Sequence, residues 1–297
     1  MLELKHHQQP MTVDEQIVNL KEKNLIVDDE DYARSILNEV SYFRLFKAYS
    51  LGLKAKNGDY YHNVHFEDIV DLYLFNSAFR QRLFIEIERV EVSLRSRISD
   101  YFCGKYGAFG YEDVCNFAIS PEIFDVFINV IQLEISRNSR TPFVRNFQEN
   151  YIGGKIPLYA LVELIGFGTL SKFYKNMKNE DKKAVAQMYK VGYTYFESWI
   201  ESIAYVRNIC AHYGRLYNNR LVKAPKLYKQ YANIGNQKVF ATLLTLKHIL
   251  PCDARWSDFV STLELLITNY PSVKLSFIGF PQDWSGYLIE KTYYQHS

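Results

Sequence analysis

The residues best suited to chemistry lie together in the segment Arg207-Asn208-Ile209-Cys210-Ala211-His212. A histidine titrates near neutrality and can act as a general base or a general acid. An arginine keeps its positive charge and can stabilise negative charge on phosphate oxygens. Arg207 and His212 are therefore candidates for RNA cleavage without a metal, in which a base takes the proton of a ribose 2′-OH and an acid protonates the leaving 5′-oxygen. One histidine per chain fills only one of these roles, so a two-fold homodimer would be needed to supply the other.

The element that must position these side chains is an apolar helix predicted over residues 195–212. Residues five apart on a helix diverge by about 140°, so Arg207 and His212 would flank a groove rather than stack. Asn208 precedes His212 by four residues and would share its face, where its amide could hydrogen-bond the imidazole and fix the tautomer. By spacing alone the R-x-x-x-x-H pattern is weakly specific, and the alternative is a capped helix end with a surface arginine and a buried histidine.

Four further cations are candidates for binding the RNA backbone. Arg215 and Arg220 follow the helix closely and make its end cationic. The helix C-terminus itself favours a protonated histidine nearby. Lys172 and Lys175 belong to a basic run over residues 172–183 that is interleaved with aromatic residues. Such a run can contact phosphates, and the alternative is a solvated helix face.

Glu163 is the candidate supporting acid, because it falls in an otherwise apolar helix and needs a cationic partner. One alternative is a pair with a buried arginine of a preceding long helix, Arg89 or Arg95. The other is that Glu163 orients Arg207 itself. The sequence leaves these two alternatives open.

A histidine pair, His62 and His65, forms an H-x-x-H pattern with Glu67 and Asp68 nearby. A metal site would need a third ligand on a rigid scaffold, whereas this pair lies in a predicted turn, so a capping or surface role is expected. The segment Gly166-Phe167-Gly168 follows no strand and does not predict a nucleotide loop. Neither a metal nor another cofactor is therefore predicted.

The rest of the chain predicts an all-α fold, because apolar residues recur every three to four positions and no strands alternate with helices. Thr12 and Glu15 are expected to form a capping box that opens the first helix. A second helix is expected from Asp28 to about Phe43, and the tail after residue 270 is expected to be irregular. The other helices are predicted over residues 66–102, 121–136, 143–151, 157–165, 170–177, 181–189, 238–250 and 257–269.

Composition sets weaker limits. The 297 residues carry a formal net charge of only +2, so nucleic-acid binding would depend on local clusters of lysine and arginine. The four cysteines form no C-x-x-C pair and indicate reduced thiols. The sequence contains neither a signal peptide nor an apolar stretch of membrane-spanning length, so a cytoplasmic protein without a membrane partner is expected. Three segments are predicted: an N-terminal helical segment 1–65, a core bundle 66–220 and a C-terminal extension 221–297.

Several blocks in the right order resemble the Abi-like family, which comprises abortive-infection proteins of the AbiD/AbiF type within the HEPN superfamily. Residues 206–220, which contain the Arg207–His212 motif, resemble the signature of the family. The match spans about residues 20–220, and its other blocks lie at residues 38–45, 71–80, 87–95, 157–163 and 167–171. Asn76 stands where the family has Asp, and Tyr159 stands where it has Trp. Neither position is expected to contact the motif, so its catalytic roles are kept.

The resemblance implies a HEPN-like helical bundle with additional N- and C-terminal helices. It also implies a metal-independent endoribonuclease of phage-defence or toxin type, with catalytic Arg207 and His212 paired across a homodimer. Some relatives are associated with a small non-coding RNA, which is therefore a possible partner. Two alternatives remain open: a module that binds RNA without cleaving it, and a helical scaffold that binds only proteins.

Overall fold

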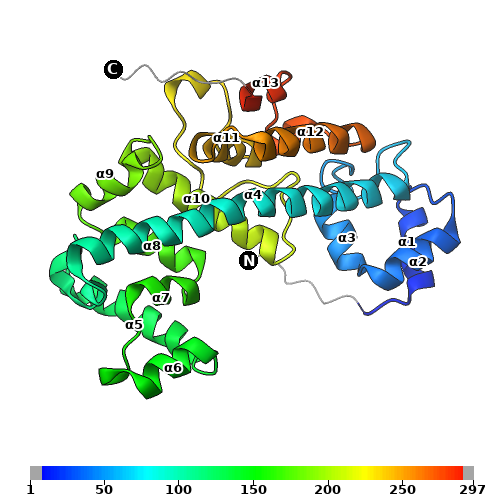
Figure 1. The fold of residues 1–297 in the computed structure, drawn as a ribbon. Helices are drawn as coiled ribbons and strands as arrows, with labels where there is room; N and C mark the ends of the chain where they lie inside the picture. The colour runs from blue at the N-terminus through cyan, green and yellow to red at the C-terminus, as the bar shows by residue number, and fades with distance from the viewer. Residues whose placement is uncertain (1–8, 290–297) are drawn as a thin grey trace, which may run out of the picture. The chain divides into compact units, whose positions relative to one another are not determined.

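The computed structural model describes residues 9–289, and the regular secondary structure of this part of the chain is helical apart from isolated β-bridges (Figure 1). The prediction of an all-α fold is therefore confirmed. The chain divides into two compact units, which are described separately. Unit 1 comprises Met1–Phe79 with Glu264–Lys274, and unit 2 comprises Arg80–Leu263 with Leu275–Ser297.

These units cut across the three segments that were predicted in chain order, 1–65, 66–220 and 221–297. Their boundary falls inside two continuous helices, α4 (Phe66–Tyr106) and α12 (Ala254–Asn269).

Unit 1 begins with α1 (Val13–Glu22), whose predicted capping box between Thr12 and Glu15 is present. The second helix was predicted as one piece, and this prediction is wrong. It is divided into α2 (Glu30–Glu39) and α3 (Tyr42–Tyr49), because Val40 is extended and the Ser41 hydroxyl accepts the Arg44 N–H as a new helix cap.

The loop of unit 1 between α3 and α4 is held by backbone pairs. Ile26 donates its N–H to Val64 O at 3.0 Å and accepts the Phe66 N–H at 2.8 Å. Lys54 and Tyr60 form an antiparallel bridge around a turn in which Gly58 has a φ of 97°. Residues 54–60 therefore form a turn with hairpin-like pairing.

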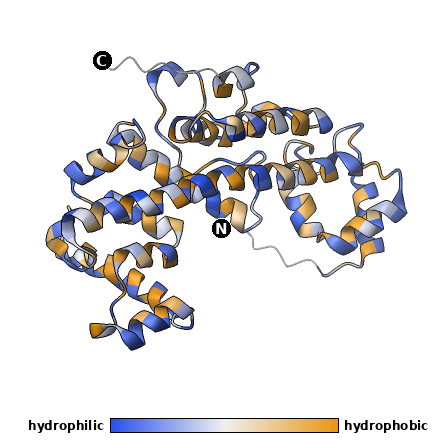
Figure 2. Ribbon diagram, in the orientation of Figure 1, coloured by the Kyte–Doolittle hydropathy of each residue, from blue (hydrophilic) through white to orange (hydrophobic). Residues whose placement is uncertain are grey.

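Unit 2 is built along the second part of α4, where hydrophilic and hydrophobic residues alternate along the ribbon (Figure 2). The helix continues four residues beyond its predicted end, since Gly104 stays helical and Gly107, at φ 79°, follows the last turn. Its fully buried face is formed by Leu83, Ile87, Val90, Leu94 and Ile98.

The middle helices of unit 2 are α5 (Pro121–Arg137), α6 (Pro142–Asn150), α7 (Leu158–Leu164), α8 (Phe167–Asn176), α9 (Asn179–Gln187) and α10 (Tyr193–Ala211). Gly166 separates α7 from α8, as predicted, and donates its N–H to the carboxylate of Glu134 at 2.8 Å. Helix α10 packs against α8, α9 and a later helix, α11 (Val239–Ile249). Helix α10 is therefore the central element that positions the candidate residues.

The C-terminal part of unit 2 contains more structure than the sequence predicted. After α12 there are a short 3₁₀ helix, Leu275–Ile278, and α13 (Trp284–Ile289). Trp284 and Leu288 are buried, and the indole of Trp256 donates to Leu288 O at 3.0 Å. The prediction of an irregular tail is therefore wrong for Leu275–Ile278 and Trp284–Ile289. The other 3₁₀ turns are Gly110–Glu112, Val114–Asn116, Ile152–Gly154 and Lys229–Tyr231.

Among the described residues, each helix is either too short or too polar to cross a membrane.

Candidate active site

Helix α10 ends at a tight cap that fixes the candidate histidine. The last helical residue is Ala211, and the N–H of His212 bonds Asn208 O at 3.0 Å. Tyr213 takes a left-handed conformation at φ 56°, and the N–H of Gly214 returns to Ile209 O at 2.7 Å. A Cβ at Gly214 would lie 2.9 Å from the Ile209 side chain, so a glycine is needed for this reversal.

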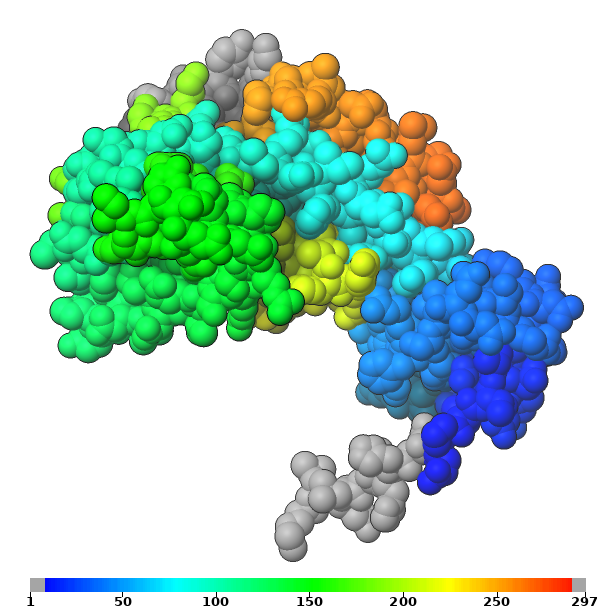
Figure 3. Space-filling model, turned by 60° about the horizontal axis from the view of Figure 1, so that its bottom comes forward, coloured from blue at the N-terminus to red at the C-terminus, as the bar shows by residue number. Residues whose placement is uncertain are grey.

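His212 lies exposed at this end of the helix, and within residues 9–289 its imidazole makes no hydrogen bond. The alternative of a buried histidine is therefore wrong. The end of α10 and the segment after it, yellow in Figure 3, reach the surface. The imidazole can thus meet a ligand from solvent.

The expected hydrogen bond between the Asn208 amide and the imidazole is absent among the described residues. His212 is the cap residue, with φ −98° and ψ 23°, so the helical phase that would place both side chains on one face does not extend to it. Asn208 is exposed and contributes its backbone carbonyl instead.

Arg207 is anchored by a carboxylate that the sequence analysis did not select. Its Nε donates to Glu91 of α4 at 3.1 Å, and Glu91 is only 7% exposed. The other Glu91 oxygen accepts from Arg95, whose second nitrogen donates to Ile165 O at 2.8 Å. Within the described part of the chain the two terminal nitrogens of Arg207 make no hydrogen bond, so they are available to a phosphate.

A second guanidinium lies at the same helix end. Arg80 is buried, donates to Cys210 O at 3.2 Å and lies 5.7 Å from the Tyr213 ring. A cation suits this position because the last carbonyls of a helix carry partial negative charge. Burial raises the pKa of the Cys210 thiol to about 12, so Cys210 is no nucleophile at neutral pH.

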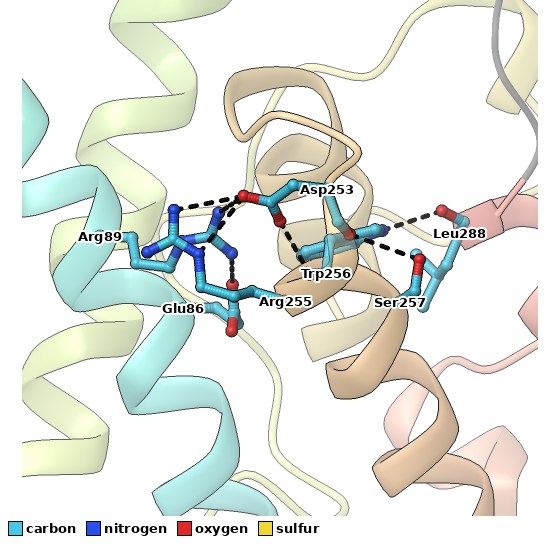
Figure 4. Close-up of polar contacts among 7 residues, drawn as sticks. All are labelled: Glu86, Arg89, Asp253, Arg255, Trp256, Ser257 and Leu288. Atoms are coloured by element: carbon cyan, nitrogen blue, oxygen red, sulfur yellow. Dashed lines mark hydrogen bonds and ion pairs between the residues drawn. The ribbon is translucent and has the colours of Figure 1, made fainter.

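Glu163 has none of its three predicted partners among the described residues. It lies exposed on α7, whereas Arg95 and Arg207 share Glu91. Arg89, the third predicted partner, pairs instead with Glu86 at 2.6 Å and with Asp253 of the α11–α12 connection at 2.8 Å (Figure 4). Both alternatives for Glu163 are therefore wrong, although Arg95 does support Arg207 through Glu91.

The sequence held one signal for Glu91. Glu91 and Arg95 are four residues apart on the long helix, a spacing at which opposite charges pair. Both lie in the block 87–95 that resembles the Abi-like family. The tertiary partner of this pair, Arg207, could not be read from the spacing.

The four predicted RNA-binding cations lie in different places. Arg215 and Arg220 follow the end of α10. Lys175 lies on the α10 side of α8, where its charge contributes to a lowered pKa of Glu201, after the larger effect of the hydrogen bond from Lys223. Lys172 instead lines an apolar hollow of about 200 Å³ against α5.

A metal could be considered only at Asp28, His65 and Glu67 of unit 1, whose ligand atoms lie within 4.8 Å of one another among the described residues. The Asp28 carboxylate accepts a hydrogen bond from the His65 ring at 2.5 Å, which raises the pKa of His65. This ion pair explains why these side chains lie close together. His62 is exposed and does not belong to the group. The H-x-x-H pair is therefore not brought together on one centre.

A hollow of about 890 Å³ in unit 2 does not contain the candidate residues. It lies between α4 and the α11–α12 connection, and its arginines are occupied: Arg89 by Glu86 and Arg97 by Met188 O. The candidate residues therefore lie at the exposed end of α10, outside this hollow.

Comparison with known families gives one match. The sequence model of the Abi-like protein family matches residues 35–218, which include Glu91, Arg207 and His212. No curated protein and no solved structure matches the chain.

Proposed function

The chain belongs to the Abi-like protein family, which indicates a role in abortive infection, and we propose that it is a metal-independent endoribonuclease of the phage-defence or toxin type. The observation that carries the proposal is the exposed His212 at the end of α10, five residues beyond Arg207, which Glu91 holds in place. An exposed imidazole supplies proton transfer, and an anchored guanidinium with open terminal donors supplies charge stabilisation.

In the proposed reaction, Arg207 binds the non-bridging oxygens of one RNA phosphate. His212 takes the proton of the ribose 2′-OH, and that oxygen attacks the adjacent phosphorus. The bond to the 5′-oxygen breaks, and the leaving oxygen receives a proton from His212 of the partner subunit. The products are a 2′,3′-cyclic phosphate and a free 5′-hydroxyl. Two copies are required because the described part of each chain offers one imidazole at this helix end.

The test is cleavage of total RNA by purified Arg207→Ala and His212→Ala variants. We expect each substitution to slow cleavage by about 10²-fold or more. The melting temperature should change little in His212→Ala, because His212 is exposed. It should fall in Arg207→Ala, because the buried Glu91 then loses one of its two cationic partners. His62→Ala is the matched control, since it removes an exposed histidine of unit 1. Cleavage retained in both active-site variants would defeat the proposal.

The mechanism has its own test. Cleavage should continue in EDTA, and mass spectrometry should find 2′,3′-cyclic phosphate ends on the fragments. A strict requirement for magnesium would exclude this mechanism. RNA that co-purifies with the protein and stays intact on long incubation would favour the alternative, a module that binds a small non-coding RNA without cleaving it.

A further inference from the structure

Two cations outside the family match are brought together in unit 2 by a backbone pair. The N–H of Leu221 donates to Gln237 O at 2.8 Å. Arg220 immediately precedes this pair and Lys238 immediately follows it, so the two cationic residues are neighbours across the connection. Both lie beyond residue 218, where the match to the Abi-like family ends.

The stem of Lys238 is packed closely. A Cβ built on Gly279 would lie 2.4 Å from the Cβ of Lys238, so the chain at Gly279 approaches this side chain at a distance that only glycine permits. Gly279 also has a φ of 81°, which favours glycine. The position of Lys238 is therefore fixed by the fold rather than by an ion pair.

The surroundings of Lys238 disfavour its charge. Burial lowers the pKa of its ammonium, and the charges of Arg215 and Arg220 lower it further. Within residues 9–289 the ammonium has neither a hydrogen-bond acceptor nor an acidic partner. A cation held beside two others costs free energy, and a bound anion would offset that cost.

We propose that Arg215, Arg220 and Lys238 form a second phosphate-binding site, which holds the RNA backbone beside the phosphate that is cleaved at His212. Arg215 lies three residues after His212, so the site continues from the reactive end of α10 toward the C-terminal extension. The C-terminal extension thereby contributes to binding of the substrate. This inference rests on the proposed function, because it assumes that the ligand is RNA.

The test uses the full-length His212→Ala protein, which should bind RNA without cleaving it. Binding of a labelled single-stranded RNA is measured by fluorescence anisotropy between about 50 and about 300 mM salt. Adding Lys238→Gln should reduce the slope of log affinity against log salt by about 0.7, the value for one lost phosphate contact on a single strand. Arg220→Gln should act in the same direction, and Lys238→Arg should restore the slope.

The matched control is Lys229→Gln, which removes an exposed lysine of the same C-terminal extension. If Lys238→Gln and Arg220→Gln keep the slope and affinity of this control while the parent binds RNA, the inference is wrong and the proposed function stands. If the parent binds no RNA even at the lowest salt, the proposed function fails and the inference fails with it. Circular dichroism establishes that each variant is folded, and Arg220, being exposed, can be replaced without disturbing packing.

Discussion

Glu91 connects the buried and exposed parts of the site at the scale of single residues. Its carboxylate accepts from Arg95, which is tied to the backbone at Ile165, and from Arg207, which faces the candidate phosphate site. A buried carboxylate is stable when its oxygens are matched by cations, and each arginine is in turn fixed by it. Glu91 is therefore a positioning residue for Arg207.

Replacing Glu91 with glutamine should loosen Arg207 without removing it. We expect Glu91→Gln to lower the cleavage rate by about 10- to 100-fold, since a displacement of about 1 Å at a catalytic group has effects of this size. We also expect a loss of roughly 1–3 kcal/mol in the free energy of unfolding. Single-turnover cleavage and urea denaturation measure the two effects.

Glu88→Gln is the control, because Glu88 is an exposed glutamate of the same helix. Partial recovery of activity in Glu91→Asp would indicate that the carboxylate, rather than the packing of the side chain, positions Arg207. A folded Glu91→Gln protein that cleaves RNA at the wild-type rate would contradict this role.

Cys210 lies inside the candidate motif, yet it should have no part in the reaction. Its pKa is raised to about 12 by burial, so the thiolate is scarce at neutral pH. We expect Cys210→Ala to keep cleavage within about two- to three-fold of wild type. In native protein a thiol reagent should label Cys115 and Cys252, which are exposed, and should reach Cys210 only after denaturation. Rapid native labelling of Cys210 would contradict its burial.

At the scale of elements, α10 and α11 meet at a half-buried histidine. His248 stacks on Trp199 at a centroid distance of 5.5 Å, and its Nε2 lies 3.0 Å from the Tyr231 hydroxyl. Burial, and to a lesser extent the charge of Lys247, lowers the pKa of His248 to about 4. The contact between these helices therefore requires a neutral imidazole.

This lowered pKa predicts a dependence of stability on pH. Below its ordinary pKa of 6.5, His248 takes up a proton in the unfolded chain but not in the folded one. Its contribution is therefore present above about pH 6.5 and is lost as the pH falls toward 4, by roughly 3 kcal/mol at most. In His248→Gln the free energy of unfolding should fall less between pH 7 and about 4.5 than in wild type. His62→Gln serves as the control, and equal acid sensitivity in all three proteins would refute the assignment.

Most elements could be predicted from apolar periodicity and caps, and the errors have local causes. The apolar pattern continues through Val40, whereas Ser41 competes as a helix cap and divides the helix there. In the tail the helical signal is short, because only Phe280, Trp284 and Leu288 recur at every fourth residue.

The site was less predictable than the elements. Arg207 and His212 were found from their types and spacing, whereas the partner of Arg207 was sought at Glu163 and lies at Glu91. Both glutamates lie in helical segments that contain apolar residues. The local sequence pattern therefore does not indicate which of the two glutamates faces α10. That choice is made by tertiary packing, which brings residues 116 positions apart to 3.1 Å.

At the scale of the whole molecule, the proposed reaction requires two copies of the chain. If each active site contains residues of both protomers, a His212→Ala subunit should inactivate the wild-type subunit with which it pairs. When the two proteins are mixed in equal amounts and allowed to exchange, about one quarter of the dimers are fully wild type. We therefore expect cleavage to fall to about one quarter, measured at constant total protein.

The control is mixing with His62→Ala, which should leave cleavage unchanged. A fall to about one half would mean that each chain acts alone, since half of the chains stay intact. At a fixed mixing ratio, dilution should lower the specific activity further as dimers dissociate.

The placement of His212 on the cap, rather than inside α10, has a consequence for how the motif can vary. A histidine within the helix would be rotated by about 100° with every inserted residue. At the cap, one residue more or fewer can be accommodated in the turn before Gly214. Arg207 and Glu91, which lie upstream in helices, then stay where they are. Variable spacing between the two basic residues is therefore compatible with a single reaction geometry.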